Sequence, residues 1–525
     1  MNNQTVPNIE VIPGGLTLAD LRRVYEGRIS ICFGLGAAER VRACQKSVME
    51  ILNKGKPVYG VNTGFGKLAH VRIEADQITE LQRRLIMSHS VGTGPLLEDD
   101  IVRLILVLKA NALGQGHSGI RWSVIELMLE MAQNDVLPAI PSKGSVGASG
   151  DLAPLSHMAA AMMGEGEMRV RGTPMPAAEA LATLGREPIT LGPKEGVALI
   201  NGTQVSTALA LAGLFAAEDL LRSTLVTGAL SVDACKGSTT PFDARIHALR
   251  RQEGQKTVSA VYRRLLDGSE VRASHLNCEK VQDPYCLRCQ PQVMGACLDQ
   301  LDFAAQVITR EANSVSDNPL VFADTGEILS GGNFHAEPIA MAADNIALAL
   351  AEIGSISERR QAMMVDASLS GLPAFLAPES GLNSGFMMAQ VTSAALVSEN
   401  KALAHPSSVD SIPTSANQED HVSMATYAAR RLGDMAENCR SIVAIEWMTA
   451  AQGLEFHAPL KTTPVLQAAI RRLREKIPSF EQDRFMAPDI ERATKLLKAN
   501  ALSTLISEPI GASYQTEQEN QNGMD

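Results

Sequence analysis

The sequence predicts a mainly α-helical protein, with an N-terminal domain over residues 1–195, a bundle of long helices over 196–507 and a disordered polar tail over 508–525. Two observations predict this fold class. From about Glu195 onward the chain is rich in Ala, Leu, Met, Glu and Arg, which form helices well, while aromatic residues make up only 4% of the sequence. In the same region, apolar residues recur in steps of four and three, which places them on one helix face. One such stripe consists of Ile339, Ala343, Ile346, Leu350 and Ile353.

The N-terminal region differs from the rest of the chain because Gly and Pro interrupt it repeatedly. These interruptions fall at residues 60–66, 92–95 and 138–154 and indicate turns between short helices. Beyond them, small residues within the apolar runs allow close approach of helices, which favours a bundle. Further long helices are expected near residues 293–312, 387–403 and 421–451.

Charge and hydropathy exclude several classes of partner. The net charge is −11 and no long basic run is present, which argues against nucleic-acid binding. The first residues lack the basic and apolar regions of a secretory signal. The longest apolar stretch, residues 205–230, contains Glu218, Asp219 and Arg222, and inserting these charged side chains into a membrane would cost considerable free energy. We therefore expect a cytoplasmic protein with a small-molecule partner, and neither a membrane nor a nucleic acid.

The cysteines and histidines predict no metal site. Eight cysteines in so long a chain do not form a disulfide scaffold, and the cytosol would keep them reduced. Cys286 and Cys289 have the spacing of a ligand pair, but no second pair follows at short range, as structural zinc requires. The ten histidines include no H-E-x-x-H pattern.

The segment from Gly144 to Leu155 has a composition that allows the backbone to cyclise. Cyclisation requires the amide nitrogen of Gly150 to attack the carbonyl of Ala148, after which Ser149 loses water to leave a methylidene group. Glycine suits the attack because it has no Cβ, and alanine leaves the carbonyl uncrowded. A hydrolase nucleophile elbow, G-x-S-x-G, is a different interpretation, but Asp151 stands where its last glycine would be. A plain glycine-rich surface loop is the remaining alternative.

The full twelve-residue segment resembles the signature of the aromatic amino acid ammonia-lyase family, G-[ST]-V-G-A-S-G-D-L-x-P-L, and matches it throughout. The resemblance implies a 4-methylidene-imidazol-5-one formed autocatalytically from Ala148, Ser149 and Gly150, with no external cofactor. It also implies a mainly α fold in which the N-terminal domain carries the electrophile. Members of the family are homotetramers with active sites shared between subunits, so the same assembly is expected here.

A glycine-rich loop around Tyr59 is not a phosphate loop. Val61 stands where the first glycine of the Walker pattern belongs, and Leu68 replaces the Ser or Thr that would hold magnesium. The resemblance instead makes Tyr59 the base that removes the β-proton of the substrate. A phenol is a weak base at its ordinary pKa, so the site would have to stabilise the anion. Without the resemblance, Tyr59 is a loop aromatic.

Three residues indicate which amino acid the enzyme takes. By resemblance, Ser88 and His89 contact the ring of the substrate, and histidine-specific members carry Ser-His there, whereas those acting on tyrosine or phenylalanine carry His-Leu or Phe-Leu. Glu419 stands where members that take carbocyclic rings have glutamine, and a carboxylate accepts a hydrogen bond from an imidazole N–H or an amine. Considered alone, His89 is a core histidine and Glu419 an acid at a helix start, favoured by the helix dipole.

Four further residues complete the expected site. Arg288 is a plausible anchor for the substrate carboxylate because a guanidinium forms two parallel hydrogen bonds with it, although alone it is equally a surface ion-pair residue. The resemblance implies that Asn201 and Tyr285 support the carboxylate and the electrophile, and that Phe334 packs beside the prosthetic group. It extends over nearly the whole chain, through residues 485–490.

The resulting expectation is the conversion of L-histidine to trans-urocanate and ammonia. The electrophile would be attacked by the substrate amine or by its ring; the sequence leaves both open, and the amine is favoured. A phenylalanine or tyrosine lyase is the nearest alternative, opposed by Ser88, His89 and Glu419. An aminomutase would use the same electrophile and return the nitrogen at the β-carbon. An inactive helical assembly protein is opposed by the intact Ala148, Ser149, Gly150 and Tyr59.

Overall fold

A computed structural model describes residues 7–53, 63, 73–275 and 281–515. The chain divides into two compact units, each treated separately below. The first unit is Met1–Gly213, Ala305–Asp344 and Pro406–Arg430; the second is Leu214–Ala304, Asn345–His405 and Arg431–Asp525. Each unit gathers segments that are distant in the sequence. The mainly α fold is confirmed, whereas the division into sequence-continuous domains stays a prediction.

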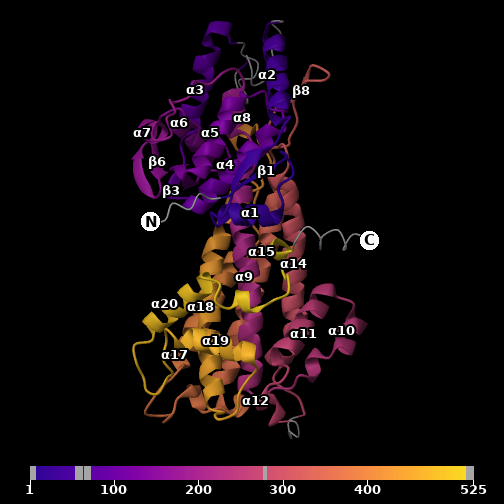
Figure 1. The fold of residues 1–525 in the computed structure, drawn as a ribbon, viewed down its shortest axis with the longest axis vertical. Coiled ribbons are helices and arrows are strands. Elements are labelled where there is room, and N and C mark those ends of the chain that lie inside the picture. The colour runs from indigo at the N-terminus through magenta and orange to yellow at the C-terminus, as the bar shows by residue number, and fades with distance from the viewer. Residues whose placement is uncertain (1–6, 54–62, 64–72, 276–280, 516–525) are drawn as a thin grey trace. The chain divides into compact units, whose positions relative to one another are not determined.

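The first unit has a helical core (Figure 1). Its central helix α4 is apolar over most of its length, and eleven of its last twelve residues are buried, as expected of a helix that is packed on every side. α1 begins with a capping box in which Thr17 and Asp20 bond each other's backbone N–H. The helices of this unit are α1 (Leu18–Tyr25), α2 (Ala37–Asn53), α3 (Ile78–His89), α4 (Asp99–Gly114), α5 (Trp122–Gln133), α6 (Leu152–Met162), α7 (Ala177–Ala182) and α8 (Glu195–Ile200).

Short strands surround these helices. The strands are β1 (Asn8–Val11), β2 (Ser30–Phe33), β3 (Thr93–Leu96), β4 (Val136–Pro138), β5 (Pro141–Lys143), β6 (Glu167–Val170), β7 (Thr173–Pro176), β8 (Leu320–Phe322) and β9 (Glu327–Leu329). β1 and β2 are parallel, β3 and β5 are antiparallel, β4, β6 and β7 form one sheet, and β8 pairs with β9. The β3–β5 pair matters most here because β5 leads directly into the loop that begins at Gly144.

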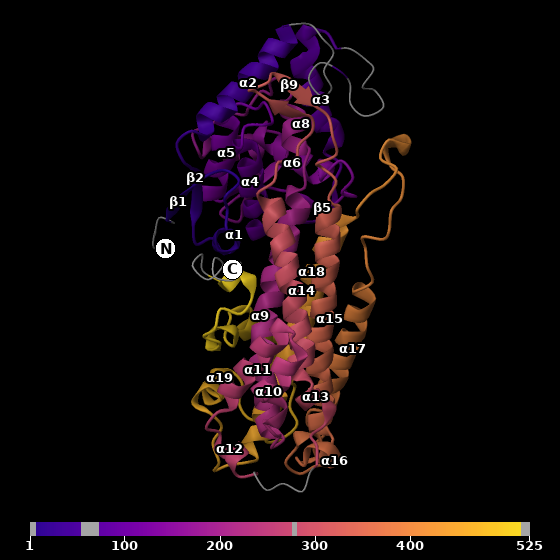
Figure 2. The same cartoon turned by 90° about the vertical axis from the view of Figure 1, so that its right-hand side faces the viewer.

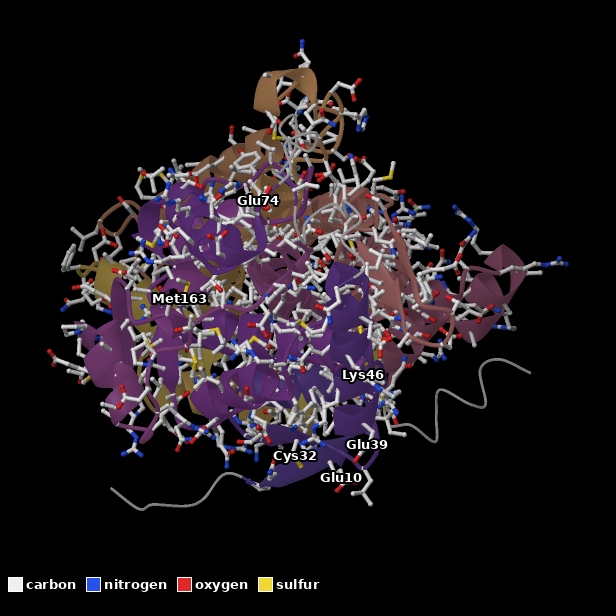
Figure 3. The ribbon with its side chains drawn as sticks, turned by 90° about the horizontal axis from the view of Figure 1, so that it is seen from above. Glu10, Cys32, Glu39, Lys46, Glu74 and Met163 are labelled. Atoms are coloured by element: carbon white, nitrogen blue, oxygen red, sulfur yellow. The ribbon has the colours of Figure 1, made fainter. Side chains whose placement is uncertain are left out.

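The described cysteines are free thiols. Cys32 pairs with Glu10 across β1 and β2, and the two side chains lie together at one edge of the unit (Figure 3). Burial, helped by the charge of Glu10, raises the pKa of Cys32, and burial raises the pKa of Cys44 to about 11. Both thiols are therefore protonated and weakly nucleophilic at neutral pH.

Four long helices dominate the rest of the fold: α9 (Gln204–Ala234), α14 (Gln290–Ala312), α15 (Glu337–Val365) and α18 (Ala425–Glu455). In the second unit they run side by side (Figure 2). All five members of the predicted apolar stripe on α15 are fully buried, and the predicted helices near 293–312 and 387–403 correspond to α14 and α17 (Met387–Leu403). The predicted helix at 421–451 is α18, shifted by four residues at each end.

Polar groups join these helices inside the second unit. Glu446 of α18 accepts hydrogen bonds from Thr227 and Ser231 of α9 and from Ser357 of α15, at 2.7–2.8 Å. It also forms a buried bidentate pair with Arg360. The remaining helices of this unit are α10 (Ala244–Arg250), α11 (Glu253–Leu266), α12 (Glu270–Ala273), α13 (Tyr285–Arg288), α16 (Ala367–Ser370), α17, α19 (Pro464–Arg474) and α20 (Ala487–Lys498).

One helix of the described chain, α15, is long and apolar enough to cross a membrane by length and composition, but 67% of its apolar window is buried inside the protein. This burial is typical of the core helix of a soluble protein. The C-terminal segment also packs onto the second unit: Ile510 is buried, and Ser513 and Tyr514 donate hydrogen bonds to Glu218 and Asp219 of α9. The placed chain thus continues past residue 507, where the tail was predicted to begin.

Candidate active site

The loop between β5 and α6 adopts a backbone that only glycine accommodates at its centre. Gly144, Gly147 and Gly150 have φ of 138°, 65° and 74°. A Cβ on Gly150 would lie 2.3 Å from the carbonyl oxygen of Gly202 and 2.6 Å from its nitrogen. Because these atoms are backbone, they have little freedom to move aside. The close approach of Gly150 to Gly202 therefore excludes every other residue at position 150.

Asp151 fixes the end of this loop. Its fully buried carboxylate accepts hydrogen bonds from the hydroxyls of Ser145 at 2.8 Å, Thr426 at 2.6 Å and Ser206 at 2.9 Å, and from the Ser206 N–H at 2.8 Å. Its own N–H donates to the Gly202 carbonyl at 2.7 Å. A buried carboxylate needs such donors to compensate for lost water. Asp151 consequently joins the loop to α9 and α18.

Ser149 is held from two sides. Its hydroxyl donates to Glu419 Oε1 at 2.9 Å, and its carbonyl accepts a hydrogen bond from Asn201 Nδ2 at 2.8 Å. The second oxygen of each partner, Asn201 Oδ1 and Glu419 Oε2, is buried and has no hydrogen-bond partner among the described residues. An unpaired buried acceptor is costly. The two oxygens thus mark positions where a ligand with N–H groups would be stabilised.

A buried lysine supports Asn201. Lys109 of α4 donates from Nζ to the Asn201 carbonyl at 2.7 Å and lies 3.4 Å from Gln204 Oε1. Burial lowers the pKa of Lys109 to about 8, so its ammonium group loses a proton more readily than an exposed lysine does. The contact fixes the backbone that carries the Asn201 amide.

Two more segments of the first unit hold the loop at Gly147. The Gly147 carbonyl accepts from the N–H of Ala336 at 3.2 Å and from the hydroxyl of Ser423 at 2.8 Å. The first contact brings the segment of Phe334, a half-buried side chain, to the loop. The second anchors the segment that carries Glu419.

The segment before Glu419 is strained. Ser415, Ala416 and Asn417 have φ of 51°, 56° and 65°, a conformation that costs energy in residues with a Cβ. Glu419 itself lies six residues before α18 begins, outside the first helical turn. The alternative interpretation of Glu419 as an acid favoured by a helix dipole is therefore wrong, because the helix starts only at Ala425.

His89 is the last residue of α3, and β3, which follows it, pairs with β5 at the entrance to the loop. Its Nδ1 lies 2.9 Å from the Leu85 carbonyl and 3.0 Å from Ser88 Oγ. Since a carbonyl only accepts, the ring proton lies on Nδ1 and Nε2 is left as an acceptor. Burial lowers the pKa of His89, which favours this neutral form at pH 7.

Tyr285 and Arg288 belong to α13 in the second unit. The guanidinium of Arg288 lies 4.8 Å from the ring centroid of Tyr285, which is 66% exposed. Arg288 lines a pocket of about 510 Å³ within that unit, and its Nε is buried without a hydrogen-bond partner in the described chain. Gln290 fixes the end of α13 by donating to the Leu287 carbonyl at 3.0 Å while accepting from Tyr262 at 2.6 Å.

Comparison with known proteins identifies the family. The sequence model of the family described as aromatic amino acid lyase matches residues 16–475 of this chain. This chain belongs to the aromatic amino acid lyase family. The resemblance predicted from the twelve-residue segment is thereby confirmed.

Several known proteins resemble the chain over almost its full length. A histidine ammonia-lyase of Photorhabdus laumondii is 57% identical over 499 residues, which cover 95% of this chain and 97% of that protein. The crystal structure of histidine ammonia-lyase from Trypanosoma cruzi has a TM-score of 0.88 at 40% identity and covers 97% of this chain and 96% of its own. The crystal structure of the tyrosine aminomutase of Streptomyces globisporus has a TM-score of 0.88 at 35% identity. The match covers 96% of this chain and 100% of that chain.

The structure brings together most, but not all, of the residues predicted for a lyase site. It joins Ser149, between Ala148 and Gly150, directly to Asn201 and Glu419, and it pairs Gly150 with Gly202. The segments of His89 and Phe334 reach the same loop, whereas Tyr285 and Arg288 meet each other in the second unit. Tyr59 lies outside the described residues. The individual roles of these residues stay predictions.

Two residues that support the loop and Asn201 were missed by sequence reasoning. Asp151 is part of the signature segment and was considered only as the residue that breaks the hydrolase pattern. Lys109 is the single charge inside the run Leu104–Leu113, which is otherwise apolar apart from Asn111. A lone lysine in such a run is a usable signal, because burial without a partner would be too costly.

Proposed function

We propose that this lyase removes ammonia from L-histidine to give trans-urocanate, using a 4-methylidene-imidazol-5-one that forms from Ala148, Ser149 and Gly150. The supporting observation is the position of Ser149, held between Asn201 and Glu419 in a turn that admits only glycine at 150. The group needs no external cofactor.

The residues present fit the formation of this group. Ring closure joins the Gly150 nitrogen to the Ala148 carbonyl carbon, and closure together with dehydration of Ser149 releases two molecules of water. A turn with positive φ at Gly147 and Gly150 is compatible with this attack, and the hydrogen bonds of Asp151 hold it. Ala148 is buried, which keeps water from its carbonyl.

When formed, the group supplies an electron-poor methylidene carbon that makes the amine a better leaving group. Asn201 contributes by donating to the Ser149 carbonyl at 2.8 Å, since a donor at a conjugated carbonyl withdraws electrons from the adjoining double bond. Lys109 keeps Asn201 in place by donating a hydrogen bond to the Asn201 backbone carbonyl. By family resemblance, Tyr59 removes the β-proton while the C–N bond breaks.

Two acceptors suit the imidazole and amine of histidine. His89, neutral and protonated on Nδ1, offers Nε2 to an N–H donor. Glu419 offers Oε2, which is buried and unpaired within the described chain. A phenyl ring has no N–H or O–H and would leave a buried acceptor unsatisfied, at a cost of about 1–3 kcal/mol. This difference favours histidine over phenylalanine.

The carboxylate of histidine is assigned to Arg288, with Tyr285 beside it. The buried and unpaired Nε of Arg288 gives its guanidinium a donor that lacks a partner in the described chain. By resemblance, these residues serve a site shared between subunits of a homotetramer. The same resemblance supports a cytoplasmic location.

The deciding experiment records ultraviolet spectra of the purified full chain with L-histidine, L-phenylalanine and L-tyrosine in turn. Each elimination produces a conjugated acrylate with its own absorption, and the urocanate band is expected with histidine alone. A cinnamate or coumarate band would overturn the ring assignment but keep the reaction class. A β-amino acid product would indicate an aminomutase.

Ser149→Ala separates the electrophile from the fold. The variant is expected to fold as the parent chain does, to lack activity, and to lose no water on intact-mass analysis. Glu419→Gln is expected to form the group and fold normally while its kcat/KM for histidine falls sharply, because it loses a charge placed at the substrate. Normal turnover by either variant would contradict the assigned role.

A further inference from the structure

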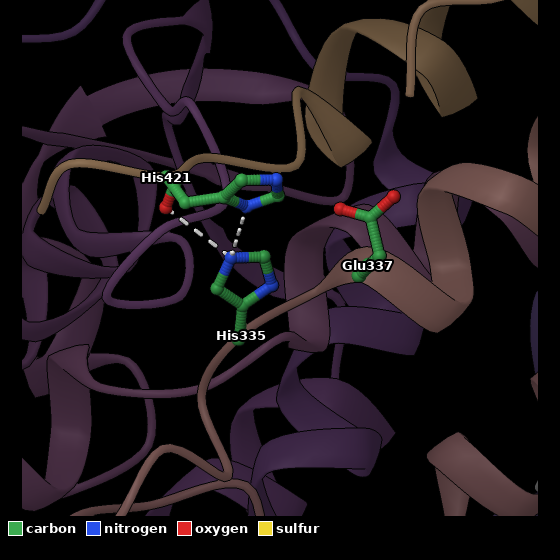
Figure 4. Close-up of side chains that lie close together, drawn as sticks. All are labelled: His335, Glu337 and His421. Atoms are coloured by element: carbon green, nitrogen blue, oxygen red, sulfur yellow. Dashed lines mark hydrogen bonds between the residues drawn. The ribbon is translucent and has the colours of Figure 1, made fainter. Parts of the chain in front are cut away.

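Two histidines and a glutamate meet near the loop but take no part in the proposed reaction. His335 precedes α15, Glu337 is the first residue of α15, and His421 lies in the segment before α18 (Figure 4). One potential ligand atom from each lies within 4.8 Å of the other two. The histidines are 86 residues apart, so no sequence spacing could reveal the cluster.

The imidazole pair already has the separation that a tetrahedral metal requires. His335 Nε2 lies 3.4 Å from His421 Nδ1. Two Zn–N bonds of about 2.0–2.1 Å at a tetrahedral angle place their nitrogens about 3.4 Å apart. The carboxylate of Glu337 lies beside the His421 ring (Figure 4). To hold an ion, this carboxylate and the two rings must rotate until their ligand atoms, already within 4.8 Å of one another, converge on one point.

The glutamate also lacks a satisfactory partner in the absence of a ligand. Glu337 Oε2 is buried and has no hydrogen-bond partner among the described residues. An acid in the first turn of a helix is stabilised by the helix dipole, which accounts for the residue type at 337. The dipole does not account for the buried oxygen or for the two imidazoles beside it, whereas a cation would satisfy all three.

We propose that His335, Glu337 and His421 bind one divalent transition-metal ion of the zinc class, with the fourth position open to water. Two imidazoles, one carboxylate and an open position form a ligand set that zinc adopts in proteins. Binding requires the proton of His335 to lie on Nδ1, so its Nε2 gives up a hydrogen bond to the His421 carbonyl. That bond is long, at 3.3 Å, and its loss costs little.

The ion would join two segments that hold the electrophile loop. Ala336, between two of the ligands, donates to the Gly147 carbonyl, as does Ser423, two residues after the third ligand. A bound ion therefore connects both supports of Gly147 and stabilises the first unit. This inference is independent of the proposed reaction, because none of the three ligands is assigned to substrate or electrophile.

The test uses the full chain freed of metal by a chelator and then titrated with Co²⁺ and Zn²⁺. One ion per chain, the visible absorption of tetrahedral Co²⁺ and a higher unfolding temperature with Zn²⁺ are expected. His335→Gln and Glu337→Gln should each weaken binding by more than about 100-fold, beyond the ~10–100-fold loss typical of an outer-shell partner. His405→Gln, which replaces an exposed histidine elsewhere, is the matched control and should bind as the parent does.

Three results would overturn the proposal. These are the absence of stoichiometric binding, an octahedral Co²⁺ spectrum, and equal affinity in the parent and in both ligand variants. Glu337→Gln keeps the shape of the side chain, so it remains informative if His335→Gln misfolds, which circular dichroism would detect. Because metal binding is measured without substrate, failure here leaves the assigned lyase activity untouched.

Discussion

Replacing Gly150 with alanine should prevent the loop from closing. The added Cβ would lie 2.3 Å from the Gly202 oxygen, and ordinary contact begins at 3.4 Å, so the two backbones must separate by about 1.1 Å (3.4 − 2.3). The positive φ of 74° costs a residue with a Cβ about 1–2 kcal/mol. Separation also breaks the 2.7 Å bond from Asp151 N–H to Gly202, worth about 1–3 kcal/mol when buried. Together these terms give about 2–5 kcal/mol.

Gly172→Ala isolates the conformational part of this cost. Gly172 has φ of 80°, but a Cβ added to it would meet nothing within 4 Å, so only the penalty of about 1–2 kcal/mol applies. Thermal unfolding at one protein concentration and intact-mass analysis compare the variants. Gly150→Ala should unfold at a lower temperature and lose no water, whereas Gly172→Ala should lose two water molecules. Equal stability and full cyclisation in both variants would refute the reasoning.

Three further predictions concern the surroundings of the loop. Asn201→Ala should lower kcat by about 10²–10³-fold, as loss of a donor at developing charge does, in steady-state assays of fully cyclised protein. Asp317→Asn should destabilise the fold by about 3–5 kcal/mol, because it removes the only carboxylate that forms an ion pair with buried Lys194 among the described residues and leaves that positive charge uncompensated. Asp324→Asn, an exposed control, should not lower the unfolding temperature. Lys109 has a pKa of about 8 in the folded protein against an ordinary lysine pKa of 10.5, so the unfolded chain binds more protons between these pH values. The free energy of unfolding of the parent chain, minus that of Lys109→Met, should therefore rise by about 3 kcal/mol from pH 8 to 10.5. A difference between the two proteins that does not change with pH would contradict this prediction.

The helices could be predicted from sequence because their evidence is local. The stripe from Ile339 to Ile353 requires only a period near 3.6, and it is buried as expected. The start of α18 was placed four residues early, at His421, whereas in the structure the Ser423 hydroxyl accepts from the Ala425 N–H and holds the turn that precedes the helix. The chain is instead non-helical there, and Met424 has φ of 57°.

The site was predictable only in part. Ser149 and Gly150 could be identified because their chemistry depends on adjacent residues. The hydrogen bond from Ser149 to Glu419 spans 270 positions, and the one from Asn201 spans 52. Pairings of this kind depend on tertiary packing, which no local pattern encodes. The same reason explains why the cluster of His335 and His421 was not foreseen.

The four hydrogen bonds accepted by Asp151 have a consequence for the production of this enzyme. They reach 6, 55 and 275 positions along the chain, to Ser145, Ser206 and Thr426. The turn around Ser149 is therefore complete only after these distant segments have folded together. A serine that remains unmodified in a purified sample would identify a chain that did not reach this state. The fraction of cyclised protein, measured by intact mass, would then report the folding yield directly.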